Sequence, residues 1–519
     1  MTDYEAVTAF LGHWGPFQQA VFFLLSLSII PNAFTGLSIV FIADTPSHRC
    51  LLPADANLSA AWRNSSIPVV RDSSSGDLVP SKCSRYKLDV LQNFSERGLV
   101  PWIDVNLSGV QQEGCLDGWE HDHSTYISTI VSEWDLVCDD RWKKPLTSSL
   151  FFCGVLTGSF ISGQFSDRYG RKIVLFATMA IQSVFTLIQV FSPSWPVFCA
   201  LFFIIGVGHI SNYVAAFVLG TEILNPPVRA VFSTVGVTLF FSLGYMMLPL
   251  IAFLIRDWRT LLLTLTLPGF LCMLFWWFIP ESPRWLLSQG RVKEAELILR
   301  NAAKKNKVEA PQVIFNLQSE KRKSQCVAAP ACCLLLNNCL LRNTIAIAYF
   351  ALSLNTSNLH GSAYFNCFLS AAIEVPAYIL SWLMYRCCPR RLILFSTLFL
   401  GGVMLLFIQL IPNNLIPLAI TLEMMGKFAV TVAFSVVYAY TAELYPTVLR
   451  NTALGACSMA SRIGSISAPY FIYLSKFNHS ILYSIQIPSV SVFSFIIYSY
   501  SLSCLKLQYV FFYEPKSEK

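Results

Sequence analysis

Apolar residues occur in this chain as long blocks separated by short polar segments. The first block, Ala20 to Ala43, holds 24 residues, and as a helix it exceeds the ~30 Å thickness of the hydrocarbon core of a bilayer. A segment in lipid must satisfy its own backbone hydrogen bonds, so these blocks predict membrane-spanning helices, about twelve in number. The other blocks lie near 145–165, 173–191, 197–219, 230–254, 260–279, 363–385, 393–411, 415–440, 451–474 and 481–511, with one further candidate in 327–354.

Basic residues gather in alternate loops between the apolar blocks. Ten Lys and Arg lie in 284–323, and three lie in each of 164–172 and 386–391. Short loops on the cytoplasmic side of a membrane are enriched in Lys and Arg, so the N-terminus is expected in the cytoplasm. The intervening loops, which hold no Lys or Arg, are 192–196, 355–362 and 412–414.

These patterns predict an all-α membrane protein with one large extracellular loop. The first twenty residues contain no Lys or Arg, so they lack the positive start of a signal peptide. We expect a cytoplasmic N-terminus (1–20), a first transmembrane helix (21–43), an extracellular loop (44–142), helices two to six (143–280), a cytoplasmic loop (281–326), helices seven to twelve (327–511) and a cytoplasmic tail (512–519).

Composition narrows the class of protein further. Hydrophobic residues make up 54% of the chain and charged residues 13%, about half the charged fraction of a soluble domain. This excludes a soluble, disordered or nucleic-acid-binding protein, and the net charge of +7 is explained by the basic loops. We expect no enzyme activity, because no nucleophile elbow, metal-ligand set or phosphate loop occurs in a suitable context.

The predicted extracellular loop carries the marks of an oxidising compartment. It contains four glycosylation sequons and an even number of cysteines. Four cysteines allow three pairings, and the sequence does not choose among them. The twelve other cysteines are expected to be small core residues. The predicted glycosylation sites are Asn57, Asn64, Asn93 and Asn106, and the predicted disulfide cysteines are Cys50, Cys83, Cys115 and Cys138.

One charged element occurs twice. A Glu and an Arg seven residues apart, with proline between them, follow the predicted fourth and tenth helices. Such a repeat indicates a duplicated unit of six helices, an arrangement common in transporters. Charged clusters at helix ends can hold one conformation and release it in another. The predicted conformational charges are Asp167, Arg168, Arg171, Lys172, Glu222, Arg229, Glu281, Arg284, Glu443 and Arg450.

Arg462 and Glu374 lie within predicted spanning helices and are therefore functional candidates. Arg462 can bind a carboxylate through two parallel hydrogen bonds. Glu374 can attract a cation, bind sodium or take up a proton. The structural alternative for Glu374 is an ion pair with Arg462 or with Lys427. Lys427 also has the i,i+4 spacing of a local ion pair with Glu423, and we favour that structural role for Lys427.

Other candidates suit a substrate that cannot donate hydrogen bonds. Aromatic faces hold quaternary ammonium groups by cation–π attraction, and Phe434, Tyr438 and Tyr213 lie on predicted helices. These rings have core packing or lipid contact as their alternative role. Asn32, Gln182 and Asn212 can supply neutral oxygens for sodium or a substrate hydroxyl, or can instead bond one helix to another.

Several motifs carry a resemblance to a known family. The stretch Gly163-Gln-Phe-Ser-Asp-Arg-Tyr-Gly-Arg-Lys172 resembles the signature of the major facilitator superfamily. More narrowly, the chain resembles the organic cation/carnitine transporters, which belong to the solute carrier organic ion transporters. The stretches that match are Phe10 to Gln18, Cys115-Leu-Asp-Gly-Trp119, Ser211-Asn-Tyr213, Ile279-Pro-Glu-Ser-Pro-Arg-Trp285, Asn358-Leu-His-Gly361 and Ala442-Glu-Leu-Tyr-Pro-Thr447.

The resemblance implies a twelve-helix major facilitator fold in two six-helix halves that works by alternating access. It implies a monomeric plasma-membrane transporter of small organic cations or zwitterions, with carnitine and sodium cotransport foremost and no other cofactor. It also places Arg462 at the substrate carboxylate, and the aromatic candidates in the cavity. His209 stands where this branch commonly has Gln, which bears on the predicted sodium site. The alternatives are an organic anion transporter of the same fold and a non-transporting variant.

Two features depart from the family pattern. The apolar stretch of the predicted seventh helix, Thr344 to Leu354, is only eleven residues long. To span a membrane it must recruit 327–341 and bury Arg342, so we expect an atypically short seventh helix. The C-terminal region is also unusual, because Ile481 to Phe512 is apolar and a tail of seven residues follows.

Overall fold

The computed structural model describes residues 4–53, 56, 58–71, 78–312, 314–315, 330–358, 361–410, 415–444 and 447–475. The chain divides into two compact units. We call the first the helical unit: it comprises Met1–Val40, Pro145–Leu254 and Arg259–Lys519. We call the second the loop unit: it comprises Phe41–Lys144 and Ile255–Trp258.

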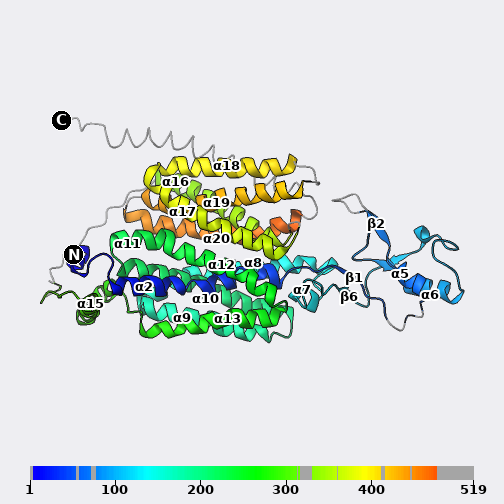
Figure 1. Ribbon diagram of the computed structural model, residues 1–519, viewed down its shortest axis with the longest axis horizontal. Helices are drawn as coiled ribbons and strands as arrows, with labels where there is room; N and C mark the ends of the chain where they lie inside the picture. The colour runs from blue at the N-terminus through cyan, green and yellow to red at the C-terminus, as the bar shows by residue number, and fades with distance from the viewer. Residues whose placement is uncertain are drawn as a thin grey trace. The chain divides into compact units, whose positions relative to one another are not determined.

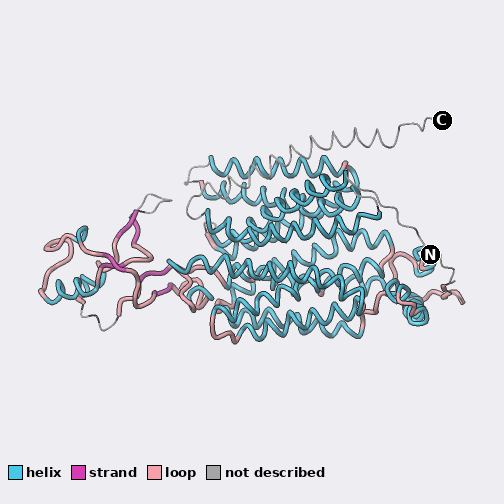
Figure 2. Tube along the Cα trace, turned by 180° about the vertical axis from the view of Figure 1, so that it is seen from behind, coloured by secondary structure: helices cyan, strands magenta, loops and turns pink. Residues whose placement is uncertain are grey.

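Long helices lying side by side build the helical unit (Figures 1 and 2). Among the described residues, ten helical segments are long and apolar enough to cross a membrane, which confirms an all-α, multi-pass fold. The predicted last block, 481–511, lies outside the described residues. One of the ten is Pro16–Ile42, and α20 (Thr447–Ser475) is a further long helix outside the ten. The other nine lie on α8 (Lys143–Tyr169), α9 (Arg171–Val190), α10 (Trp195–Ile223), α12 (Val237–Leu254), α13 (Trp258–Met273), α16 (Pro330–Leu354), α17 (Ala363–Cys387), α18 (Arg390–Leu410) and α19 (Ile416–Leu444).

Short helices precede and connect the long ones. Near the N-terminus, α1 and η1 lead into the first span, and η4 is a π-helical turn that opens α12. In the predicted cytoplasmic loop, α15 is a polar helix with a buried alanine and leucine stripe. These elements are α1 (Tyr4–Val7), η1 (Ala9–Leu11), α11 (Pro226–Val231), η4 (Phe232–Gly236), η5 (Leu274–Trp277), α14 (Pro283–Ser288), α15 (Val292–Asn306) and η6 (Asn355–Asn358).

The first span is interrupted. It consists of α2 (Pro16–Leu27), α3 (Ile30–Leu37) and α4 (Ile39–Ile42). Pro31 causes the first break, because it has no N–H and its ring clashes with the carbonyl four residues earlier. Below the break, Asn306 of α15 accepts a hydrogen bond from the Phe17 backbone N–H (2.9 Å) and donates one to Gln18 Oε1 (2.8 Å). The two parts of the span are therefore anchored separately.

The seventh spanning helix forms in one piece. Helix α16 begins at Pro330 and runs for 25 residues, so it includes Asn337, Asn338 and Arg342. Arg342 is buried, and its Nη2 lies 3.5 Å from the Val437 carbonyl oxygen of α19. Proline suits the first turn of a helix, and α16 recruits the polar segment that precedes Thr344. The atypically short membrane span stays a prediction.

Small sheets stapled by disulfides build the loop unit. A compact core of Trp62, Tyr86, Leu91 and Leu107 lies beneath α6. The helical pieces are α5 (Ala60–Asn64), α6 (Leu88–Glu96), η2 (Leu107–Gly109), α7 (Ile130–Glu133) and η3 (Cys138–Trp142). Three antiparallel pairs form: β1 (His48–Cys50) with β6 (Trp119–His121), β2 (Val69–Arg71) with β3 (Leu78–Pro80), and β4 (Arg85–Tyr86) with β5 (Gln112–Glu113).

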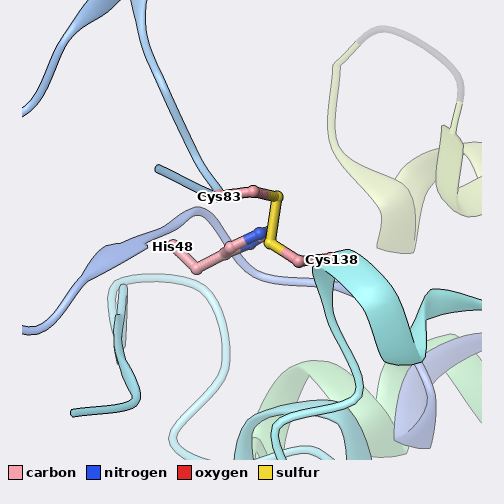
Figure 3. Close-up of side chains that lie close together, drawn as sticks. All are labelled: His48, Cys83 and Cys138. Carbon is pink, nitrogen blue, oxygen red and sulfur yellow. A yellow bond between two sulfur atoms is a disulfide. The ribbon is translucent and has the colours of Figure 1, made fainter. Parts of the chain in front are cut away.

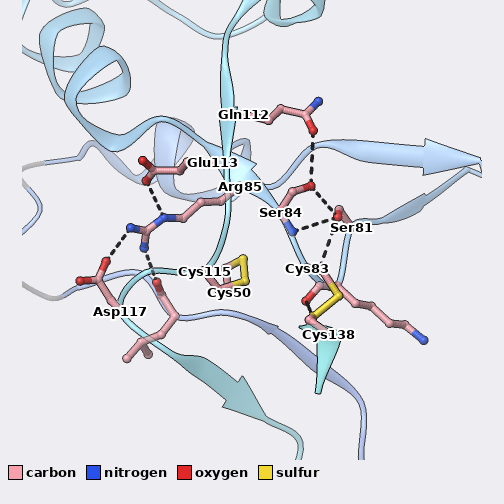
Figure 4. The surroundings of a disulfide bond; sticks show 12 residues. Cys50, Ser81, Cys83, Ser84, Arg85, Gln112, Glu113, Cys115, Asp117 and Cys138 are labelled. Carbon is pink, nitrogen blue, oxygen red and sulfur yellow. Dashed lines mark hydrogen bonds and ion pairs between the residues drawn. A yellow bond between two sulfur atoms is a disulfide. The ribbon is translucent and has the colours of Figure 1, made fainter. Parts of the chain in front are cut away.

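The structure has one of the three possible cysteine pairings, Cys50 with Cys115 and Cys83 with Cys138 (Figure 4). Beside them, Arg85 is 2% exposed and pairs with Glu113 and Asp117. The buried cation therefore ties β4 to β5 and to the chain after Cys115.

The His48 imidazole faces the Cys83–Cys138 disulfide (Figure 3). Burial lowers the pKa of this ring below its ordinary value of 6.5. Both sulfurs are used in the disulfide and offer no thiolate to a metal ion.

The sequon asparagines lie in the same unit. Asn64, Asn93 and Asn106 are exposed, so each has room for a glycan. Asn57 lies outside the described residues.

Glycine sets the closest helix contact of the helical unit. A Cβ on Gly154 of α8 would overlap the Phe203 carbonyl of α10, and a Cβ on Gly206 would overlap the Phe151 carbonyl of α8. The two backbones therefore approach as closely as small residues allow in membrane helices.

We expect Gly154→Leu to destabilise the helical unit, because its side chain must push α8 from α10, at a cost of ~1–3 kcal/mol. Thermal unfolding of the detergent-solubilised protein measures this. Gly163→Leu is the matched control on the same helix, since a Cβ there meets no atom within 4 Å. Equal melting temperatures for the two variants would contradict the contact.

Candidate functional site

A buried carboxylate lies at the centre of the helical unit. Glu374, in the middle of α17, has no exposed surface. Tyr349 of α16 donates its hydroxyl to Glu374 Oε1 at 2.8 Å. Ser242 of α12 donates to Oε2 at 3.2 Å. Two helices therefore bring hydroxyl donors to one carboxylate on a third, and a buried charge requires such partners.

The partner of this carboxylate is Lys427 of α19, whose Nζ lies 3.3 Å from Glu374 Oε1. Lys427 also donates to Ser370 of α17, and its Nζ lies 4.8 Å from the centre of the Tyr245 ring of α12. Of the structural alternatives for Glu374, the structure thus has the pair with Lys427. Glu423, the predicted i,i+4 partner of Lys427, accepts a hydrogen bond from Asn355 at 3.3 Å.

We call this set the central charge network: Ser242, Tyr245, Tyr349, Ser370, Glu374 and Lys427. Ser242 and Tyr245 come from the first six-helix half, and the other members come from the second. Helix α12 packs along α17, so the network joins the two halves across their interface. A transporter of two halves must break or rearrange such contacts when the halves move.

A second group of polar side chains lies between the first, third and fourth spans. Asn212 Nδ2 donates to Asn32 Oδ1 at 3.3 Å. Gln182 Nε2 donates to Thr35 Oγ1 at 2.7 Å and lies 3.4 Å from the Pro31 carbonyl oxygen. The broken first span therefore directs both a side chain and a carbonyl group into this set. We call it the polar cluster: Asn32, Thr35, Gln182, His209 and Asn212.

Four atoms of the polar cluster are buried without a hydrogen-bond partner among the described residues: Asn32 Nδ2, Gln182 Oε1, His209 Nδ1 and Asn212 Oδ1. Buried polar groups are normally bonded, so atoms left over in one place indicate room for a water, an ion or a ligand. Side-chain amide orientations are assigned from the bonding pattern, and either orientation leaves an amide atom of Asn32 and of Asn212 unpaired.

Arg462 of α20 faces the same region. It is partly buried, its Nε has no hydrogen-bond partner in the part of the chain that the structure describes, and its guanidinium interacts electrostatically with His209. The His209 ring lies 5.4 Å from the Phe151 ring and occupies space that Gly36 leaves open. The structure thus brings Arg462 toward the polar cluster, while Glu374 is held by Lys427.

The aromatic candidates lie in different surroundings. Phe434 of α19 stacks on Tyr349 with ring centres 4.8 Å apart, so it borders the central charge network. Tyr213 is partly buried against the core of the first half and interacts electrostatically with Tyr378 of α17. The Tyr438 side chain lies outside the described residues.

The conformational charges gather at one end of α8, α9 and α10. Arg171 pairs with Asp167 at 2.9 Å and with Glu222 at 3.2 Å. Glu281 accepts hydrogen bonds from the backbone N–H groups of Arg171 (3.0 Å) and Lys172 (3.1 Å), so it caps the start of α9. Gly170, with φ of 105°, permits this turn.

Other members of the charged group contact carbonyls and rings. Arg229 donates to the Leu224 carbonyl at 3.1 Å. Lys172 lies 4.6 Å from the Trp276 ring, Arg284 4.6 Å from the Tyr4 ring, and Arg168 5.5 Å from the Tyr169 ring. The side chains of Glu443 and Arg450 lie outside the described residues, so the second copy of the motif stays a prediction.

Sequence reasoning missed the hydroxyl groups of the central charge network. Ser242 and Tyr245 are three residues apart, and Ser370 and Glu374 are four apart, so each pair lies on one helix face. A search for polar residues repeating at helical spacing inside apolar blocks would have found them.

Comparison with known proteins places this architecture. A model of the Major Facilitator Superfamily matches residues 145–469. The inward-open, partially occluded xylose transporter XylE of E. coli has the same fold, with a TM-score of 0.59 and 13% identity over 93% of this chain and 99% of that chain. The fold therefore defines a multi-pass membrane transporter rather than an enzyme.

Sequence relatives narrow the class. The chain is 56% identical over 494 residues to organic cation/carnitine transporter 2 of Mus musculus, covering 93% of this chain and 88% of the relative. It is 56% identical over 495 residues to the Homo sapiens protein of that name, with the same coverage. Solute carrier family 22 member 4 of Mus musculus is 55% identical over 494 residues, covering 93% of this chain and 89% of that one. The chain therefore belongs to the organic cation/carnitine transporter branch of solute carrier family 22.

We expect Lys427→Ala to destabilise the protein by roughly 3–5 kcal/mol, because it leaves the Glu374 charge buried without its partner. Adding Glu374→Gln should restore much of the loss, since the amide stays bonded to Tyr349 and Ser242 without a charge. Thermal unfolding in detergent of wild type, both single variants and the double variant measures the coupling. Lys305→Ala, on the exposed face of α15, is the control, and additive effects would argue against the pair.

Proposed function

We propose that this protein is a plasma-membrane transporter that carries a zwitterion, most simply carnitine, together with sodium by alternating access. Support comes from the named relatives and from the chemistry of the two buried polar groups. Ergothioneine and tetraethylammonium-like cations are further substrates of this kind. The predicted monomeric state, the cytoplasmic N-terminus and the glycosylated extracellular loop belong to the same proposal.

Arg462 carries the assignment of a carboxylate. Its Nε is buried without a hydrogen-bond partner among the described residues, and a buried donor without a partner is costly. A substrate carboxylate satisfies it with charge-assisted bonds. In this proposal the ammonium end of the zwitterion lies toward the aromatic rings Phe434, Tyr438 and Tyr213, where cation–π attraction supplies ~0.5–2 kcal/mol per ring.

Sodium is assigned to the polar cluster. Sodium prefers neutral and anionic oxygens, and Gln182 Oε1, Asn212 Oδ1 and the Pro31 carbonyl offer them near the break in the first span. Interrupted helices serve coupling ions in this way in other transporters. His209 replaces one amide side chain with an imidazole, and its unpartnered nitrogen adds one ligand or one hydrogen-bond acceptor.

A second candidate function is the transport of organic anions. It is favoured by one observation: Glu374 is already neutralised by Lys427, so Arg462 leaves this part of the interior with an excess positive charge. The third alternative is a non-transporting variant, which rests on the short apolar stretch of the seventh helix and on the unusual C-terminal region.

Arg462→Ala should reduce radiolabelled carnitine uptake ~10-fold or more, because a charge-assisted hydrogen-bond pair is lost. Uptake of tetraethylammonium, which has no carboxylate, should fall much less. Uptake is normalised to protein at the cell surface, and exposed Arg291→Ala is the control. Equal loss for both substrates would mean that Arg462 is structural, while uptake of a monovalent organic anion without carnitine uptake would support the second candidate.

Gln182→Leu should raise the sodium concentration needed for half-maximal carnitine uptake, since it removes a proposed oxygen ligand. Gln189→Leu is the matched control: Gln189 is also buried on α9, two turns away, and donates to the Phe198 carbonyl at 3.4 Å. Carnitine uptake of the wild type that is unchanged when sodium is replaced would refute coupling altogether.

A further inference from the structure

The geometry points to a thiol modification site between the seventh and eleventh spans. We infer that Cys339 of α16 and Cys457 of α20 form a dithiol that a peroxide closes into a disulfide, tying the two helices together. Both cysteines are free in the structure, and their sulfur atoms lie 3.7 Å apart although the residues are 118 apart in the chain.

The place of the two residues explains how they meet. Cys339 is the tenth residue of α16 and Cys457 the eleventh of α20. Both helices follow predicted cytoplasmic segments, so they run in the same direction and put residues of equal depth opposite each other. Among the described elements, α16 and α20 form one of the most extensive helix contacts.

A glycine holds the helices at this spacing. A Cβ on Gly464 would lie 2.5 Å from the backbone oxygen of Asn343. Gly464 is two turns beyond Cys457, and Asn343 one turn beyond Cys339. The two backbones are therefore in contact near the sulfur pair. This packing holds the helices at a spacing that keeps the two thiols together.

Little movement is needed to form the bond. Sulfur atoms in a disulfide are ~2.05 Å apart, so the 3.7 Å separation of the two sulfur atoms closes by less than ~2 Å when the bond forms. In the reaction, one thiol loses its proton and its sulfur attacks hydrogen peroxide, which breaks the O–O bond and gives a sulfenic acid and hydroxide; the hydroxide takes up the proton and becomes water. The second thiol then attacks the sulfenic sulfur, the S–S bond forms and a second water leaves. The thiols are oxidised by two electrons and the peroxide is reduced.

The consequence for transport rests on the proposed function. Helix α20 carries Arg462, five residues beyond Cys457, and α16 carries Tyr349, which binds Glu374. A covalent tie between them fixes the proposed carboxylate site relative to the central charge network. We expect oxidised protein to lose uptake and to regain it when a thiol reductant restores both cysteines.

The chemical test needs no substrate. Membranes containing the full-length protein are treated with hydrogen peroxide, the remaining thiols are alkylated, and the digested protein is examined by mass spectrometry. A peptide pair linked through Cys339 and Cys457, lacking two hydrogen atoms and released by dithiothreitol, is the expected result. Alkylation of both cysteines as separate peptides after peroxide treatment would overturn the inference.

The functional test compares peroxide inhibition of uptake in wild type, Cys457→Ser and Cys272→Ser. Cys272, on α13, is another buried free cysteine and is the matched control. Loss of inhibition in Cys457→Ser alone supports the tie. Equal inhibition in all three places the functional effect elsewhere. If the proposed transport function fails but the linked peptide forms, the modification site stands and only its consequence for transport is rejected.

Discussion

The structure depends on the neutralisation of charge away from water, and Glu374 with Lys427 is where this constraint acts most strongly. A charged side chain at the centre of a membrane helix costs roughly 2.5–3.5 kcal/mol. Each of these two residues recovers that cost only if α12, α16, α17 and α19 are rotated so that hydroxyl groups and the opposite charge face inward. The pair therefore fixes the rotation of these four helices about their own axes. Apolar packing alone would not fix it, because lipid is as apolar as the helix surfaces that it meets.

Two kinds of polar group share the interior. The central charge network is closed: Glu374 meets Tyr349, Ser242 and Lys427 at 2.8–3.3 Å. The polar cluster is open, since several of its atoms have no partner among the described side chains. Because of this contrast, the interior can hold the two six-helix halves together and still leave polar atoms for the proposed ligands. Stability comes from the satisfied set, and recognition is assigned to the unsatisfied one.

Much of this architecture could be predicted from the sequence, for identifiable physical reasons. Apolar blocks give spanning helices because the bilayer sets their length. Local patterns could not say which residues meet across the bundle: Glu423 has ideal spacing to Lys427, yet the ion pair forms with Glu374. Likewise, four cysteines leave three pairings open, and Glu222 meets Arg171 on another helix. Pro31 could have predicted a break in the first span, but the run of 24 apolar residues around it indicated one continuous helix. The last apolar block and the second copy of the charged motif stay predictions.

The interruption at Pro31 also affects how motion passes through the protein. Below it, α2 is bound through Asn306 to a polar helix of the predicted cytoplasmic loop. Above it, Asn32 and Thr35 bind the third and fourth spans. A continuous helix would transmit any displacement of one end directly to the other end. The first span is instead broken at Pro31, and the helix on each side of the break has its own contacts. The break in the first span therefore separates the two contacts, and α2 can shift without moving the residues of the polar cluster.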